Sequence, residues 1–288
     1  MDPQLLFELQ PEDEMRKLVV LGRRADGRGL REQRGIIISR NDYAPSYASN
    51  VGANAVTIGS SLVHLGETKV ACGVTLQVGV PTTLHPDRGA VEFDVSLGTL
   101  CSPRYDQRGK HDDAYELEAL LDAVIHKNGM LDLEQLCIER ERHAFQLNVH
   151  VVCLSHAGNL QDTCLLAVVA ALQATQLPEA IVQPAPGRTG ADGHTVLLSR
   201  EKSTLLRLRS LPVPVTLAVF DGALLLDPTQ EELQVAHGVI RSVVLDDGSL
   251  GYFSHVDNRG AGMKAPDLLR VVEAAQGAAL DIRQRLSA

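Results

Sequence analysis

One stretch of the chain constrains the fold more than any other. Between residues 145 and 153, apolar side chains alternate with polar ones. Because successive side chains of a β-strand point to opposite faces, this pattern predicts a strand with one face in the core. Gly158 and Asn159 mark the following turn, and a helix is predicted from Asp162 until shortly before Leu177.

Other segments add strands on both sides of this unit and two further helices. The apolar runs around Gly66 predict a hairpin across residues 55–80, and helical spacing predicts a helix that begins near Asp113 and another from about Pro266. Because hairpin-linked strands accompany separate helices, the fold class is α+β with antiparallel or mixed sheets. The residues expected to face inward on the last helix are Leu269, Val272, Ala279 and Leu280.

Composition excludes several classes of protein. A length of 288 residues fits about two domains, and the 3 % of aromatic residues leaves little for stacking on bases. The formal net charge of −9 restricts contact with RNA to a local patch. The five cysteines form no Cys-x-x-Cys pair and the histidines show no metal-ligand spacing, so we expect free thiols, no metal and no cofactor. No secretory or membrane-spanning segment is expected.

Three polar segments are candidates for chemistry. Gly187–Gly193 is rich in glycine but lacks the Gly-Lys-Ser/Thr ending of a phosphate loop, so it is interpreted as a surface loop. Asp227, Glu231 and Glu232 follow a run of leucines, where carboxylates can hold Mg²⁺ or act as acid and base. Residue types alone favour a turn at Asp227 and a solvated helix that carries both glutamates.

A short basic loop is the third candidate. Arg104 and Arg108 would allow it to bind phosphate groups. The nearby carboxylates Asp106, Asp112 and Asp113 neutralise much of this charge. A contact with RNA and a plain solvated loop therefore both stay open.

Five segments stand in a fixed order along the chain. They are Arg24–Arg28, Gly59–Val78, Glu116–Leu117, Gly158–Asp162 and Leu226–Glu232. Together they resemble the motifs of RNase PH-like proteins. The last two are similar to the branch of eukaryotic exosome ring subunits that resemble the second, non-catalytic archaeal ring subunit.

The resemblance implies an RNase PH-like fold (ribosomal protein S5 domain 2-like) with two lobes of mixed sheets and packed helices. The expected boundaries are an N-terminal extension over residues 1–30, a first lobe over 31–182, a loop over 183–194 and a second lobe with the C-terminal helix over 195–288. The family assembles into six-subunit rings around a pore for single-stranded RNA. Implied partners are other RNase PH-like ring subunits, cap subunits with RNA-binding domains and associated exoribonucleases, in the nucleus, nucleolus and cytoplasm.

Three departures from the active members point to a silent site. Active members place Gly-Thr-Arg or Gly-Ser-Ser where this chain has Gly158–Leu160, and leucine offers no donor to phosphate. Active members carry a second Asp six residues after the first, and this chain has Leu233 at that position. They also use an Arg in the helix that begins near Asp113, where only His126 and Lys127 are basic here. We expect no catalytic residue, and an active-site remnant made of Asp227, Glu231, Glu232, Gly158 and Asn159.

The sequence thus predicts a non-catalytic scaffold subunit of the RNA exosome ring, with Arg104 and Arg108 as candidate RNA contacts. One alternative is an active phosphate-dependent 3'-to-5' exoribonuclease that uses Asp227 and Glu232. A second alternative is an unrelated α+β binding module, which would be a stable monomer.

Overall fold

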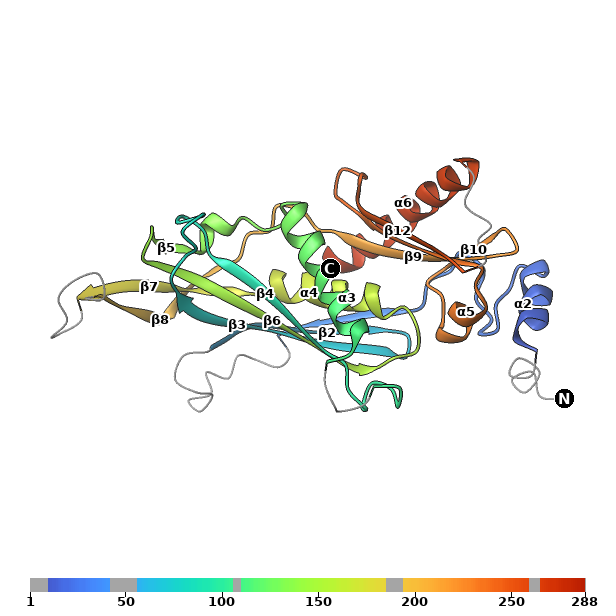
Figure 1. Cartoon of the computed structure of the whole chain (residues 1–288), viewed down its shortest axis with the longest axis horizontal. Coiled ribbons are helices and arrows are strands. Elements are labelled where there is room, and N and C mark those ends of the chain that lie inside the picture. The colour runs from blue at the N-terminus through green and yellow to red at the C-terminus, as the bar shows by residue number, and fades with distance from the viewer. Residues whose placement is uncertain (1–9, 42–55, 106–109, 185–193, 259–264, 288) are drawn as a thin grey trace.

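The computed structural model describes residues 10–41, 56–105, 110–184, 194–258 and 265–287. A mixed sheet occupies one half of the molecule, with the strand order β1-β2-β3-β6-β4 and β5 paired to β6 (Figure 1). Neighbouring strands are antiparallel except β4 and β6, which are parallel. The strands are β1 (Ile36–Arg40), β2 (Val56–Leu65), β3 (Thr68–Gly79), β4 (Ala90–Ser96), β5 (Cys137–Glu139) and β6 (His143–Ser155).

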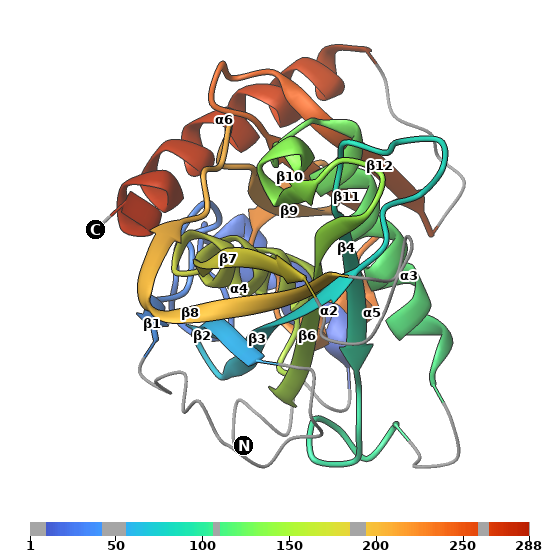
Figure 2. The same cartoon turned by 90° about the vertical axis from the view of Figure 1, so that its left-hand side faces the viewer.

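A second, antiparallel sheet has the order β10-β9-β11-β12. A separate two-stranded ribbon of β7 (Gln176–Pro184) and β8 (His194–Leu205) extends at the other end of the molecule (Figures 1 and 2). The strands of the second sheet are β9 (Val213–Phe220), β10 (Ala223–Leu226), β11 (Gly238–Val244) and β12 (Leu250–Asp257).

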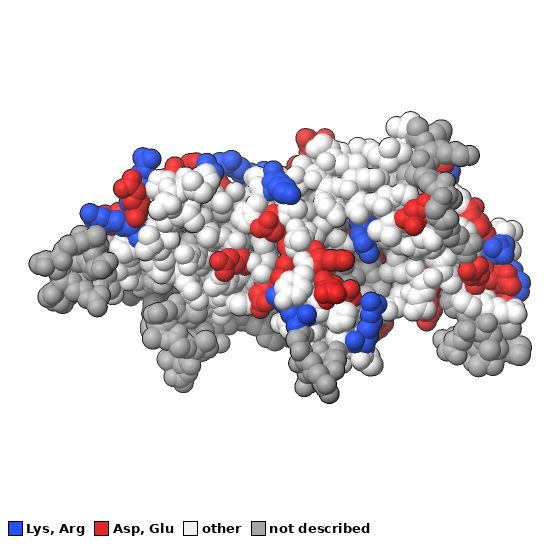
Figure 3. All heavy atoms as spheres, viewed as in Figure 1, with Lys and Arg blue, Asp and Glu red and all other residues white. Residues whose placement is uncertain are grey.

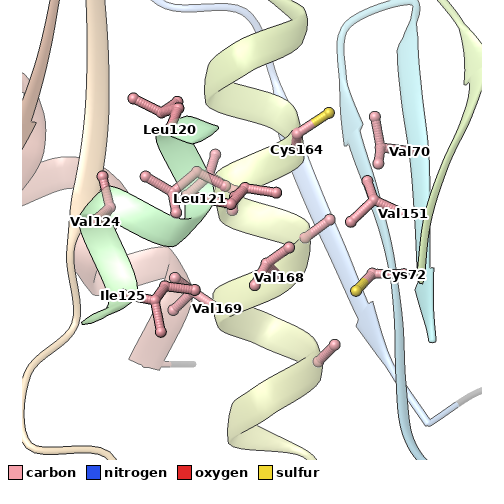
Figure 4. Packing of buried hydrophobic residues seen from close by; sticks show 14 of the residues in the cluster. Val70, Cys72, Leu120, Leu121, Val124, Ile125, Val151, Cys164, Val168 and Val169 are labelled. Atoms are coloured by element: carbon pink, nitrogen blue, oxygen red, sulfur yellow. The ribbon is translucent and has the colours of Figure 1, made fainter. Parts of the chain in front are cut away.

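The helix α4 lies at the centre of the core. Every residue from Asp162 to Leu172 is buried, and the helix contacts β2 and β3 of the first sheet as well as β9 of the second. Figure 4 shows α4 between the sheet and α3, with Val168 and Val169 among the packed residues. One hydrophobic core therefore joins both sheets. The helices are α2 (Pro11–Val20), α3 (Asp112–Asp122), α4 (Leu160–Gln173), α5 (Gln230–Val235) and α6 (Ala265–Ser287), with a π turn at Ala123–Lys127 and a 3₁₀ turn at Leu133–Leu136.

A smaller cluster attaches the N-terminal helix α2 to the second sheet. Met15 is fully buried there with Ala218, Phe220, Leu225 and residues of α5. The polypeptide between α2 and β1 then runs along the edge of this cluster to the first sheet. This path carries a series of arginines to the place where the two sheets meet.

The strand and turn predictions from periodicity are confirmed. In β6 the residues Leu147, Val149 and Val151 are fully buried while the intervening polar residues are not. The hairpin of β2 and β3 turns at Gly66, whose φ of +57° suits glycine. Helix α4 begins at Leu160 after Asn159, slightly before the predicted start.

One prediction about secondary structure is wrong in part, and one strand was not predicted. Helix α6 buries Val271, Ala275 and Ile282 and, of the four predicted residues, Ala279, whereas the predicted Leu269 and Leu280 are 66 % and 60 % exposed. The buried stripe holds small and large side chains alike, from Ala275 to Leu286, so side-chain size was a poor guide to the inward face. The strand β7 was also not predicted; Pro178 fits it because the ribbon has a register shift between Pro178 and Ala180.

Candidate functional site

The site expected from the sequence forms where two turns converge. Asp227 directly follows β10, and Gly158 and Asn159 precede α4. Gly158 has a φ of +96°, and a Cβ atom there would lie 2.4 Å from the backbone nitrogen of Gln230. Only glycine permits this close approach of the two turns. The structure thus brings Gly158, Asn159 and Asp227 together, from segments far apart in the sequence.

The Asp227 carboxylate is occupied by protein donors on both oxygens. Oδ2 accepts hydrogen bonds from the Arg34 backbone N–H at 3.0 Å and from Arg34 Nε at 2.8 Å. Oδ1 accepts from Arg34 Nη2 at 2.7 Å and from Asn159 Nδ2 at 2.8 Å. Arg28 approaches Oδ2 at 3.4 Å. Asp227 is 1 % exposed, so no free face of this carboxylate meets solvent.

The charge of Asp227 is stabilised by this arrangement. Burial by itself would raise the pKa of the carboxyl group, but the hydrogen bonds and charge of Arg34, with Asn159, outweigh it and hold the pKa below its ordinary value. A carboxylate held in this way is a poor general base, because it binds a proton weakly. Its geometry is that of a structural ion pair.

Arg34 is committed in the same way. Besides Asp227, its guanidinium donates to the carbonyl oxygen of Ala157 at 3.1 Å and to that of Gly158 at 3.3 Å. Thr68 donates to the same Gly158 oxygen at 2.7 Å. The cation nearest to the Asp227 carboxylate therefore has its donors directed at protein acceptors rather than at a space where a phosphate would lie.

Asn159 links Asp227 to a second buried carboxylate. Its side-chain amide donates to Asp162 as well as to Asp227, at 2.8 Å in each case. Asp162 also accepts from the Thr216 backbone N–H and hydroxyl, at 2.9 and 2.7 Å. Burial raises the pKa of Asp162 to about 6, with the nearby negative charge of Asp227 adding to the effect. This network joins α4 to β9 and to the end of β10.

Glu232 belongs to a different, adjacent cluster. It forms a buried ion pair with Arg24, whose side chain also donates to the carbonyl oxygens of Leu226 at 2.5 Å and Asp227 at 2.9 Å. Glu232 also closes a capping box with Thr229 at the start of α5. The expectation that both glutamates lie on a solvated helix is wrong for Glu232, which is 2 % exposed. Glu231 is exposed to solvent.

The three departures from active members have structural counterparts. Leu160 is buried in the main core and Leu233 packs against the smaller cluster. His126 lies beside Val91 O at 3.3 Å and Asp122 at 3.4 Å. Each position that supplies a polar group in active members thus serves packing or a local contact here.

Of the predicted RNA contacts, only Arg104 lies in the described part of the chain, and Arg108 lies outside it. Arg104 is 62 % exposed along its side chain and approaches Asp113 of α3 at 3.6 Å. Figure 3 shows acidic side chains gathered over the α3 region of this face, with a few basic ones beside them. The surroundings of Arg104 are acidic, as the sequence indicates. The Gly187–Gly193 loop also lies outside the described residues.

Sequence reasoning missed Arg34 and Thr216, which hold the network together. A signal for Arg34 was present, because Arg23, Arg24, Arg28, Arg31 and Arg34 crowd into one short stretch of an acidic chain. Such a concentration of cations predicts buried or bridging carboxylates nearby. No comparable pattern marks Thr216, a threonine within an ordinary strand.

Within the described residues no group of three His, Cys, Asp or Glu side chains is arranged to hold a metal ion. Nor is any described helix long and apolar enough to cross a membrane.

Sequence models of two domains match the chain. The model described as 3' exoribonuclease family, domain 1, matches residues 28–178, and that of domain 2 matches residues 210–278. The chain belongs to the 3' exoribonuclease (RNase PH) family. The predicted RNase PH-like α+β fold is therefore confirmed.

Individual relatives of this RNase PH-family chain are exosome proteins. The exosome complex component Rrp42 of Methanocella arvoryzae is 28 % identical over 287 residues, which cover 99 % of this chain and 98 % of that protein. A chain of the Archaeoglobus fulgidus exosome with RNA bound to the active site is 26 % identical, with a TM-score of 0.76 and coverage of 98 % and 99 %. A chain of an archaeal exosome core is 25 % identical, with a TM-score of 0.72 and full coverage of both chains.

These comparisons confirm the resemblance to exosome ring subunits. Between two sibling subunits, the segments beginning at Ser102 and Cys137 favour ribosomal RNA-processing protein 42 over protein 43. The name Rrp42 of the relatives agrees with that preference.

Proposed function

We propose that this chain is a non-catalytic ring subunit of an RNA exosome, which scaffolds the ring and its pore during 3'-to-5' processing and degradation of RNA. The similarity to Rrp42 proteins and to chains of archaeal exosomes over nearly the whole length supports the place in the ring. Its partners would be active-type RNase PH-like subunits, cap subunits with RNA-binding domains and associated exoribonucleases. It would act in the nucleus, the nucleolus and the cytoplasm, on rRNA, mRNA and non-coding RNA.

The observation that carries catalytic silence is the state of Asp227. Phosphorolysis requires donors that hold inorganic phosphate and a carboxylate that assists its attack. Here the carboxylate is buried, accepts from Arg34 and Asn159 on both oxygens, and has a lowered pKa. The side chain of Leu160 supplies no donor. The charged groups of the site neutralise one another instead of facing a substrate.

The experiment compares the lone chain with the assembled ring. The full chain is purified alone and after coexpression with an active-type RNase PH-like partner, and native mass spectrometry records the assembly. Both samples receive single-stranded RNA with and without inorganic phosphate, and the release of nucleoside diphosphates is measured. We expect a ring that contains this chain, and no nucleoside diphosphate from the chain alone.

The active-exoribonuclease alternative makes the opposite prediction. Phosphate-dependent shortening of RNA by the chain alone, lost in Asp227→Asn and kept in the exposed control Glu231→Gln, would refute catalytic silence. A stable monomer that never joins an RNase PH-like partner would refute the place in the ring and favour the unrelated binding module. The two parts of the proposal therefore fail separately.

A further inference from the structure

We propose that Asp113 lowers the affinity of this chain for RNA, because its carboxylate competes with RNA phosphate groups for the guanidinium of Arg104. The inference rests on the proposed function, in which Arg104 is a candidate contact of the ring with single-stranded RNA. It adds to that contact a carboxylate that limits its strength, through the ion pair between the two side chains.

A turn places Arg104 beside the start of α3. The N–H of Tyr105 donates to the carbonyl oxygen of Ser102 at 3.1 Å. Tyr105 is 2 % exposed and belongs to the main core, so the segment that carries Arg104 is fixed at its next residue. The Arg104 side chain itself is largely exposed, and its Nη2 lies 3.6 Å from Asp113 Oδ2.

Asp113 is held in position independently of Arg104. The Tyr105 hydroxyl donates to Asp113 Oδ2 at 3.1 Å. Burial, followed by the charge of Asp113, raises the pKa of Tyr105, so the hydroxyl keeps its proton and remains a donor. Asp113 also lies in the first turn of α3, where the helix dipole favours a negative charge. The carboxylate is therefore the fixed member of the pair, and the exposed guanidinium is the member that can move.

Two histidines near this pair do not replace either member. Burial, with the charge of Arg104 adding to it, lowers the pKa of His156, so this imidazole is neutral at neutral pH and offers RNA no charge. His111 Nδ1 lies 3.8 Å from Asp113 Oδ2, which is beyond hydrogen-bond distance. Among the described residues, the competition for the guanidinium thus concerns Asp113.

An RNA phosphate needs the same donors that face Asp113. Arginine binds phosphate through its planar fork of N–H groups, so the guanidinium has to turn away from the carboxylate or share its donors. The carboxylate also repels a phosphate that approaches Arg104. Because both side chains are partly exposed, water and salt screen these effects, and such a pair changes the affinity by about 2–5-fold.

The test measures the RNA affinity of the assembled ring by fluorescence anisotropy, with a labelled single-stranded RNA at low and at high salt. Asp113→Asn removes the charge but keeps an oxygen that can accept from Tyr105. We expect about 2–5-fold tighter binding than in the wild type at low salt, and a smaller gain at high salt. Asp112→Asn is the matched control, since Asp112 is exposed on the same turn and forms no ion pair with a described residue.

A double-mutant cycle separates this competition from a general change of charge. In the Arg104→Gln background, Asp113→Asn should have no more effect than Asp112→Asn, because the guanidinium is absent. Circular dichroism checks that each variant folds, and Asp113→Ser, which also keeps an oxygen at the start of α3, serves if Asp113→Asn does not. Equal effects of Asp113→Asn and Asp112→Asn, or a gain that persists without Arg104, would overturn the inference.

The proposed function fails in a different way. Native mass spectrometry shows whether the chain joins a ring, and a chain that stays a monomer refutes the scaffold. The same variants are then compared on the monomer, so the competition for Arg104 is decided in either case. An RNA affinity that Arg104→Gln leaves unchanged overturns the inference and leaves the place in the ring intact.

Discussion

The buried ion pair of Arg24 and Glu232 provides the sharpest test of how the chain is held together. Replacing Arg24 with methionine keeps most of the side-chain volume and removes the charge. The change deprives Glu232 of its cation, and it removes the donors to the carbonyl oxygens of Leu226 and Asp227. Glu232 would keep the Thr229 N–H, at 2.8 Å.

The expected loss is large because one buried charge remains without a partner. Removing one member of a buried pair costs about 3–5 kcal/mol. Each carbonyl left without its donor adds about 1 kcal/mol where water cannot replace it. An exposed pair offers the control: Arg16 and Asp221 are 2.7 Å apart, but their side chains are 49 % and 35 % exposed. Arg16→Met should cost at most about 1 kcal/mol.

Urea unfolding followed by far-ultraviolet circular dichroism measures both variants, since the chain has no tryptophan. The double variant Arg24→Met with Glu232→Gln should recover part of the loss, because glutamine can still cap α5 without a buried charge. The reasoning is refuted if Arg24→Met costs no more than Arg16→Met. The single variant Glu232→Gln is measured as well, and the reasoning is equally refuted if the double variant loses the sum of the losses of Arg24→Met and Glu232→Gln.

Three further changes give distinct readouts. Gly158→Ala should destabilise the fold by about 1–3 kcal/mol in urea, from its left-handed φ and the clash with α5, whereas Gly73→Ala has open space and should not. The raised pKa of Asp162 means that the folded state binds the proton more tightly than the unfolded state, so the free energy of unfolding should fall by up to about 3 kcal/mol as the pH rises from 3.8 to about 6. Asp162→Asn should abolish this fall. In the assembled ring, Arg104→Glu should weaken RNA crosslinking more than the equally exposed control Arg209→Glu; equal effects would contradict a role for Arg104.

Asp227 and Asp162 should change the stability in opposite directions as the pH rises. Asp227 has a lowered pKa, so the stability it contributes is present above its unfolded pKa and is lost as the pH falls below that value. Asp162 acts in the opposite direction and at higher pH. A flat difference between wild type and Asp162→Asn across pH 3.8–6 would show that the buried carboxyl does not hold its proton as the structure indicates.

Much of the architecture was predictable because it depends on local periodicity. The alternation in β6, the turn at Gly66 and the helix after Asn159 each follow from neighbouring residues, and the structure confirms them. The inward face of α6 was not predictable in this way. Leucines at 269 and 280 are exposed because the sheet that α6 packs on, mainly β9, selects the stripe through Ala275, and the spacing within the helix does not reveal that choice.

The site shows the same division between local and distant determinants. The turns at Gly158 and Asp227 were identified from residue types and from the family resemblance. The partner of Asp227 was not, because Arg34 reaches it across 193 residues of sequence. Glu232 was taken for a solvated residue for the same reason, since its burial depends on Arg24, 208 residues away. Residue types identify polar clusters, whereas only the fold decides which members neutralise one another.

Asp227 also shows why an active-site-like carboxylate is weak evidence for activity. Its two oxygens connect the segment before β1, through Arg34, with the start of α4, through Asn159. Its own backbone N–H bonds to Thr216 of β9 at 3.0 Å, and its carbonyl accepts from Arg24. A residue that joins four segments in this way is needed for folding whether or not any phosphate binds beside it. These contacts give Asp227 a structural role that does not depend on catalysis, which is consistent with the proposed catalytic silence.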